Sequence, residues 1–269
     1  MKRNTLLTAT CLVLGLTAAS TGHAHRAWML PSATVLSGEN VWVTVDAAVS
    51  NSIFYFEYHP LGLDGLIVKA PDGAGLEPQN QAQTRYRSVF DVELTQEGTY
   101  TVEIRNDGLF GRYNLNGEAK RWRGSLDTLT ELPADAKDLE LTESQRRMQV
   151  FVTRGAPSFE TLKPVGQGLE LVPLTHPNDL FVGEQAQFRF TIDGEPAKEL
   201  DITLIREGIR YRDQVEERVI TTDAEGIARI DWTHPGMYWL ETQVETSSKL
   251  PQVGERRLGY SATLEVLPL

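Results

Sequence analysis

Cysteine is almost absent from this chain of 269 residues. Its one cysteine, Cys11, lies in an apolar stretch from Leu6 to Ala19 near the amino end, too early in that stretch to be the lipid-bearing cysteine of a lipoprotein. If the stretch is removed during maturation, the remaining protein has no thiol. Disulfides and thiolate metal ligands are then excluded.

The chain also lacks an apolar run long enough to cross a membrane comfortably. Lys2 and Arg3 precede the apolar stretch, and small residues ending at Ala24 follow it. A charged start, an apolar centre and a small-residue end are typical of a secretory signal peptide. We expect cleavage after Ala24, which would leave His25 as the first residue of a periplasmic protein that does not span the membrane.

The chain has fewer basic than acidic residues. There are 26 Lys and Arg residues against 37 Asp and Glu, a net charge of −11. Removing Lys2 and Arg3 with the leader leaves 24 basic residues, so the mature net charge is −13. An acidic protein of this kind disfavours nucleic acid and anionic lipid and tolerates cations. Because 41% of the residues are hydrophobic, a folded core is expected and wholesale disorder is excluded.

Familiar catalytic motifs are missing as well. The sequence contains no hydrolase elbow, Walker loop, dinucleotide fingerprint or His-Glu-x-x-His zinc motif. Paired acids such as Glu216-Glu217 are interpreted as solvated surface. The basic cluster at 120–123 is expected to pair with neighbouring acids. We therefore predict that the protein is not an enzyme.

Helical periodicity is scarce, and alternation of apolar and polar residues takes its place. Such alternation predicts half-buried antiparallel strands, and the turns between them are rich in Gly, Pro, Asn and Asp. The one helix candidate is 133–147, with Pro133 at a plausible first-turn position. The fold is therefore predicted to be all-β, with strands at 41–47, 90–94, 100–104, 186–192 and 262–266.

A weak repeat divides the chain into two halves. Gly98 and Tyr100 form a Gly-x-Tyr sequence at the start of one strand, and Gly236 and Tyr238 repeat it later. This pattern resembles the tyrosine corner of immunoglobulin-like sandwiches, although glycine turns and strand tyrosines can also coincide by chance. We predict two immunoglobulin-like or prealbumin-like β-sandwiches joined by a short, partly helical connector. The expected boundaries are 1–24 for the signal peptide, 25–117 and 168–269 for the sandwiches, and 118–167 for the connector.

The histidines follow an unusual pattern. Of the four that would survive cleavage, three are followed by proline: His59, His176 and His234. Proline favours extended geometry in the residue before it and stiffens the loop. Stiff loops at strand ends often carry binding residues, although a His-Pro turn can equally well serve only to cap a sandwich.

As a new amino terminus, His25 would offer both its amine and its imidazole to one cation and so close a chelate ring. These donors suit divalent nickel, cobalt, copper or zinc; the alternative is that His25 merely flanks the cleavage site. Glu57 lies two residues before His59 and would share a strand face with it, and Asp46 is a further oxygen donor. The candidate metal ligands are His25, His59, His176, His234, Glu57 and Asp46.

A further pattern is carried by six segments of the mature chain, 25–32, 35–39, 46–51, 54–61, 168–179 and 235–240. These segments resemble the DUF4198 family of secreted bacterial proteins, and the resemblance covers nearly the whole mature chain. It implies a periplasmic component of cobalt or nickel uptake that works as a soluble partner of membrane uptake components. It favours His25 and His59 as ligands ahead of His176 and His234. Nickel or cobalt would be the ion, with copper or zinc as alternatives.

Three functions remain open at this stage. The leading hypothesis is capture of a divalent metal and its delivery to a membrane uptake system. The second is a structural or carbohydrate-binding sandwich module without metal. The third is an enzyme that holds copper between the amino-terminal histidine and a second histidine, resembling the histidine brace of secreted monooxygenases. Support for the second comes from four tryptophans, Trp28, Trp42, Trp122 and Trp239.

Overall fold

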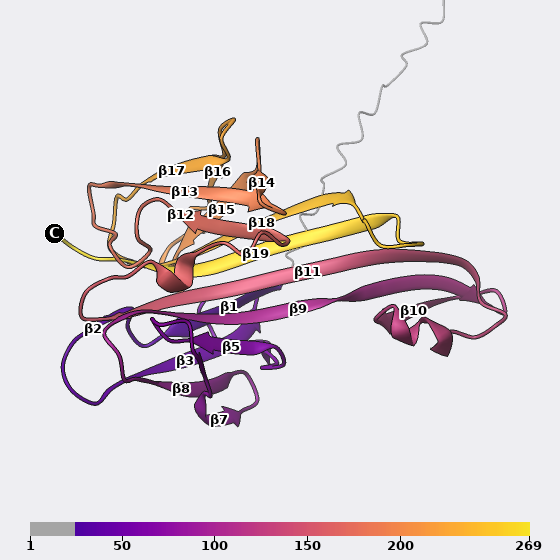
Figure 1. The fold of residues 1–269 in the computed structure, drawn as a ribbon, viewed down its shortest axis with the longest axis horizontal. Coiled ribbons are helices and arrows are strands. Elements are labelled where there is room, and N and C mark those ends of the chain that lie inside the picture. The colour runs from indigo at the N-terminus through magenta and orange to yellow at the C-terminus, as the bar shows by residue number, and fades with distance from the viewer. Residues whose placement is uncertain (1–24) are drawn as a thin grey trace, which may run out of the picture.

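The computed structural model describes residues 25–269, so the predicted signal peptide at 1–24 lies outside the described residues. The described chain is nearly all β, as the sequence predicts, and its strands form three sheets (Figure 1). Helical structure in this part of the chain consists of three short 3-10 turns, η1 (Asp127–Glu131), η2 (Glu160–Leu162) and η3 (Ile209–Tyr211). None of these has the length or apolar character of a membrane span.

The first small sheet is antiparallel and has the order β1-β3-β8-β7, with β4 also paired to β3. In β3, Val41, Val43 and Val45 are buried while Trp42 and Thr44 between them are exposed, which is the alternation predicted from the sequence. Its strands are β1 (Arg26–Pro31), β3 (Val41–Ser50), β4 (His59–Pro60), β7 (Gln79–Gln83) and β8 (Ser88–Leu94).

The central sheet has ten strands and runs through both halves of the chain in the order β16-β15-β18-β19-β11-β9-β5-β6, with β10 on β9 and β2 on β11. Two long strands, β9 and β11, run the length of the molecule in Figure 1. The strands are β2 (Val35–Leu36), β5 (Leu66–Lys69), β6 (Gly75–Leu76), β9 (Gly98–Leu115), β10 (Glu118–Gly124), β11 (Lys137–Arg154), β15 (Asp201–Arg206), β16 (Arg218–Thr221), β18 (Gly236–Ser247) and β19 (Glu255–Val266).

The second small sheet has the order β12-β13-β14, with β17 on the other edge of β13. A tight hairpin joins β13 to β14 at Asp193 and Gly194, whose φ angles are 51° and 86°. Positive φ at both central residues is the geometry that such short hairpins require, and an Asp-Gly pair adopts it readily. The strands are β12 (Leu169–Pro173), β13 (Gln185–Ile192), β14 (Glu195–Pro196) and β17 (Ile227–Asp231).

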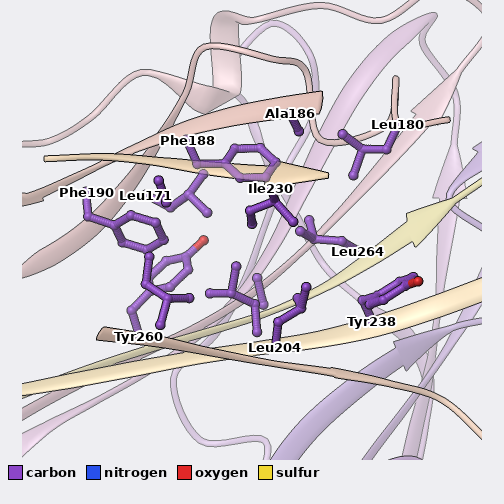
Figure 2. Close-up of a cluster of buried hydrophobic side chains, with 14 of the residues drawn as sticks. Leu171, Leu180, Ala186, Phe188, Phe190, Leu204, Ile230, Tyr238, Tyr260 and Leu264 are labelled. Atoms are coloured by element: carbon purple, nitrogen blue, oxygen red, sulfur yellow. The ribbon is translucent and has the colours of Figure 1, made fainter. Parts of the chain in front are cut away.

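The two largest hydrophobic cores of the described chain lie between these sheets. One fills the space between the first small sheet and the β5, β9 and β11 region of the central sheet. The other lies between the second small sheet and β15, β18 and β19, where Phe188 and Phe190 lie across from Leu204 and Leu264 (Figure 2). The fold is therefore a pair of β-sandwiches that share one sheet.

Strand β11 contributes to both cores. Val150 and Val152 are buried in the first core, whereas Phe151 between them is buried in the second. Because successive side chains of a strand point to opposite faces, the two sandwiches lie on opposite faces of the central sheet at this strand. Figure 1 shows the two small sheets on either side of it.

The helix predicted at 133–147 is wrong, because most of that range belongs to β11. β11 pairs antiparallel with β9 along its length and in parallel with β19 from Thr142 to Val150. Pairing on both edges overrides the weak local preference of this polar stretch. The range 118–167, expected to be a connector, thus contributes β10 and β11 to the central sheet.

The two Gly-x-Tyr sequences form tyrosine corners, which confirms the prediction. The Tyr100 hydroxyl donates to the carbonyl oxygen of Gln96 at 3.0 Å, and the Tyr238 hydroxyl donates to that of His234 at 2.8 Å. Gly98 and Gly236 precede them with φ angles of 123° and 125°. These values lie in the region that favours glycine. An added Cβ would approach a neighbouring side chain to 2.7 Å and 2.5 Å, respectively.

Candidate functional site

The first predicted ligand, His25, lies directly before β1 and is exposed. Its imidazole stacks on the ring of Tyr58, with the ring centroids 3.7 Å apart and the planes inclined by 13°. The Tyr58 ring also lies 4.8 Å from the ring of His59, which is exposed too. Tyr58 therefore connects two accessible imidazoles from separate segments of the chain.

Strand pairing explains how these segments meet. The end of β3 pairs with β1 on one edge and with β4 on the other, and Val49 is the register partner of both Ala27 and His59. The segment 51–58 between β3 and β4 is anchored by Ile53, which is fully buried in a cluster with Trp28. The starts of β1 and β4 are thus held on either side of one strand.

The hydrogen bond of His59 leaves one ring nitrogen available. Its Nδ1 lies 2.8 Å from the carbonyl oxygen of Pro60. Because a carbonyl can only accept, Nδ1 carries the proton in the neutral ring and Nε2 presents its lone pair. Glu57, in contrast, is occupied: its Oε1 accepts a hydrogen bond from the backbone N–H of Ser52 at 2.7 Å. Glu57 serves here as an anchor of the loop.

Asp46 is engaged away from the histidines. Its Oδ1 lies 3.2 Å from Nη1 of Arg87, whose guanidinium covers the ring of Phe56 at 4.7 Å. Burial raises the pKa of Asp46, and the positive charge of Arg87 opposes that rise. The carboxylate is therefore committed to an ion pair on β3.

His176 is buried and fully hydrogen-bonded. Its Nε2 lies 3.1 Å from the carbonyl oxygen of Ser158 and 3.0 Å from Oγ1 of Thr99, and its Nδ1 accepts from the backbone N–H of Asn178 at 3.1 Å. Burial lowers the pKa of His176. With both ring nitrogens in use, this side chain ties the loop after β12 to β9.

His234 lies at the second tyrosine corner, before β18, and is exposed. Its Nδ1 lies 3.0 Å from Oγ1 of Thr233. Of the six predicted ligands, the structure connects only His25 and His59 through a shared aromatic neighbour. Across 25–269, no three His, Cys, Asp or Glu side chains are grouped as a metal site would need.

Tyr58, the residue that joins the two histidines, was not among the site residues predicted from the sequence. Its position beside His59 is visible in the sequence, but its contact with His25 depends on β1 and β4 flanking β3. The four tryptophans considered as a sugar platform also differ in their exposure to solvent. Trp28 and Trp239 are buried, whereas Trp122 is half-buried and Trp42 is 39% exposed.

Comparison with known proteins gives one informative match. The family model "Domain of unknown function (DUF4198)" matches residues 22–246. No curated protein matches significantly. The D0-D1 domain of Intimin is similar at 9% identity, with 88% of this chain and 96% of that chain covered and a TM-score of 0.22. A marsupial T cell receptor is similar at 9% identity, with 91% and 74% covered and a TM-score of 0.22. Scores this low support no conclusion about this chain.

The family model spans most of the sequence, and the protein therefore belongs to the DUF4198 family.

Proposed function

We propose that this protein is a periplasmic carrier of a divalent transition metal, nickel or cobalt, that supplies a membrane uptake system. The observation that carries the proposal is the stacking of His25 on Tyr58 beside His59, which connects two exposed imidazoles from separate segments. The metal is cargo, and the protein's task is to capture it and hand it on.

Three nitrogen donors are available to such an ion. Cleavage after Ala24 would give His25 a free amine, which forms a chelate ring together with its own imidazole. Nε2 of His59 is the third donor, because Nδ1 is held by the Pro60 carbonyl. Imidazole and amine nitrogens suit nickel, cobalt, copper and zinc. Copper in the same place would also suit the oxidative enzyme considered above.

The hydrogen bond of His59 has a further use in this proposal. An imidazole that donates its other N–H to a carbonyl is held in one tautomer and one orientation, as in many protein metal sites. Stacking on Tyr58 similarly limits the rotation of the His25 ring. Both donors are thus partly ordered before an ion arrives, and the entropy lost on binding is smaller.

The test uses protein that has been exported and cleaved naturally, with its amino terminus established by intact mass. Nickel, cobalt, copper and zinc are titrated separately by calorimetry. We expect one ion per chain, with binding lost in His25→Ala and in a variant that carries extra residues before His25. His59→Ala should weaken binding. His234→Ala is the matched control and should bind as the wild type does, because that exposed histidine belongs to the second tyrosine corner.

Two results would contradict the proposal. Binding that persists unchanged in both the His25→Ala and the extended protein would remove the amino-terminal chelate. Turnover of a reductant by the copper-loaded protein, with no effect of gene deletion on cellular nickel or cobalt, would favour the copper enzyme. Reduced accumulation of nickel or cobalt in cells that lack the gene would support delivery.

A further inference from the structure

An arginine-rich groove lies on the central sheet, away from the histidines. Beyond the first core, β9, β10, β11 and β19 form an open groove of about 590 Å³. In Figure 1, β10 and the adjoining ends of β9 and β11 extend past both small sheets. The groove is lined by five arginines, Arg112, Arg121, Arg123, Arg146 and Arg257.

The strand register places these arginines on one face. Arg112 on β9 is the partner of Arg121 on β10, and Ser144 on β11 is the partner of Arg257 on β19. On β11, Arg146 lies two positions after Ser144 and four positions before Val150, a residue of the first core. Because every second residue of a strand points to the same side, the arginines share the face that carries the first sandwich.

Within 25–269, three of the five guanidinium groups make no hydrogen bond or ion pair, namely those of Arg112, Arg121 and Arg146. Burial raises the pKa of the carboxyl of Glu241 on β18 and the charge of Arg146 opposes that rise, but the two side chains form no ion pair. Arg257 differs, because it pairs with Glu255 at 2.8 Å and Glu245 at 3.1 Å.

The pair formed by Arg112 and Arg121 is unfavourable by itself. The two residues face each other across antiparallel strands, where like charges destabilise a sheet. On the other edge of β9, Arg112 is the register partner of Glu140 on β11. These two side chains form no ion pair within the described chain, so Glu140 does not neutralise Arg112 in this way. An anionic group bound from outside would neutralise both arginines at once.

The spacing of the arginines indicates an extended ligand. Arg146 is the register partner of Asn106, which lies six residues before Arg112 on β9. At about 3.3 Å per residue, the backbone positions of Arg146 and Arg112 are about 20 Å apart along the sheet. A single small anion cannot reach both. A chain that carries several anionic groups can.

The other groove residues favour a polypeptide as that chain. Glu140 and Glu255 line the same groove and would repel a uniformly charged polyphosphate, whereas a peptide can place amide or basic groups beside them. Both aromatic rings of the groove already have neighbours, although Phe110 is 43% exposed. The guanidinium of Arg123 covers the Phe110 ring at 5.3 Å, and Trp122 packs against a small apolar cluster.

We propose that this groove docks an extended acidic segment of a partner protein, with the unpaired Arg112, Arg121 and Arg146 binding its carboxylates. The planar guanidinium fork matches a carboxylate with two parallel hydrogen bonds. Ser144 and the amide N–H groups of Asn106 supply neutral hydrogen-bonding groups between the charges, whereas the Thr142 hydroxyl already donates to Glu255. The inference is independent of the metal proposal, because His25 and His59 belong to the first small sheet and its edge.

Fluorescence anisotropy with a labelled peptide of alternating glutamate and serine tests the proposal. We expect Arg112→Gln, Arg121→Gln and Arg146→Gln each to weaken binding about 3- to 10-fold, and the triple variant to abolish it. The matched control is Arg85→Gln, an exposed arginine before β8 whose loss changes the net charge equally. It should leave the affinity unchanged.

Several results would overturn the docking proposal: no binding of the peptide by the wild type, equal binding by the triple variant, or an equal loss in Arg85→Gln. Tighter binding of polyphosphate or polygalacturonate than of the peptide would assign the groove to a different polymer and overturn it as well. Thermal unfolding of the triple variant provides the folding control. Because the substitutions relieve repulsion between Arg112 and Arg121, the midpoint should not fall.

Discussion

The guanidinium of Arg147 on β11 lies 2.6 Å from the carboxylate of Glu170 on β12, and both side chains are almost fully buried. Glu170 also accepts hydrogen bonds from the backbone N–H groups of Val165 and Gly166. Burial alone would raise the pKa of Glu170, but these hydrogen bonds and Arg147 lower it. The central sheet is thus tied to the second small sheet by a buried ion pair.

Substitution of Arg147 should therefore destabilise the fold strongly. Arg147→Met leaves the Glu170 carboxylate buried without its counter-charge, and the free energy of unfolding should fall by about 3 kcal/mol or more. The measurement is urea-induced unfolding. Arg105→Met is the control. The ion pair of Arg105 with Glu103, at 3.5 Å, is partly exposed to solvent, so its removal should lower the free energy of unfolding by less than about 1 kcal/mol. Equal losses for the two variants would contradict this account.

The two tyrosine corners should differ in strength. The Tyr100 hydroxyl accepts from the backbone N–H of Gln96 at 2.6 Å as well as donating to its carbonyl, whereas Tyr238 only donates. Tyr100→Phe leaves one more backbone group unpaired. We expect a loss of about 2 kcal/mol for Tyr100→Phe and about 1 kcal/mol for Tyr238→Phe. The control is Tyr211→Phe, because Tyr211 is 84% exposed. The reverse order of losses in chemical denaturation would exclude this explanation.

His176 should make stability depend on pH. Burial lowers its pKa, so the folded protein favours the neutral ring. The stability that this ring contributes is complete above the unfolded histidine pKa of about 6.5 and declines as the pH falls below it. Unfolding free energies at a series of pH values should therefore fall less steeply below 6.5 in His176→Gln than in the wild type. His234→Gln is the control and should keep the wild-type slope; identical slopes for all three proteins would refute the assignment.

Tyr58 should influence metal affinity without being a ligand. Its ring stacks on the imidazole of His25, and such a contact is worth about 0.5–1.5 kcal/mol. Tyr58→Ala should therefore weaken metal binding by about 2- to 10-fold in calorimetry, whereas Tyr58→Phe should retain the affinity because the ring remains. Tyr86→Ala, another partly exposed tyrosine, is the control. A loss of affinity in Tyr58→Phe as large as in Tyr58→Ala would point to the hydroxyl instead.

Local patterns explain which parts of the fold were predictable. The alternation in β3, the Asp193-Gly194 hairpin and the two tyrosine corners each depend on residues close together in the chain. The long strand β11 was missed because its first half is polar and is stabilised by β9 and by β19, which begins more than a hundred residues after Thr142. No local pattern records such a pairing.

The same distinction applies to the candidate site. His-Pro sequences identified histidines near strand ends, but they could not distinguish an exposed ring from a buried one. His176 is buried because Thr99, which is 77 residues away in the chain, meets its Nε2. The contact between His25 and Tyr58 likewise depends on β3 pairing with two strands at once.

The shared strand also determines the order in which the molecule can fold. When the chain is made from its amino end, the wall of the first core formed by β5 and β9 stays incomplete until Val150 and Val152 of β11 are made. One edge of β11 then stays unpaired until β19 has been made. A cut between β11 and β12 would therefore separate Phe151 from the rest of the second core and leave one edge of β11 unpaired. Pairings between such distant segments also make folding slow, because a long loop must close before they form.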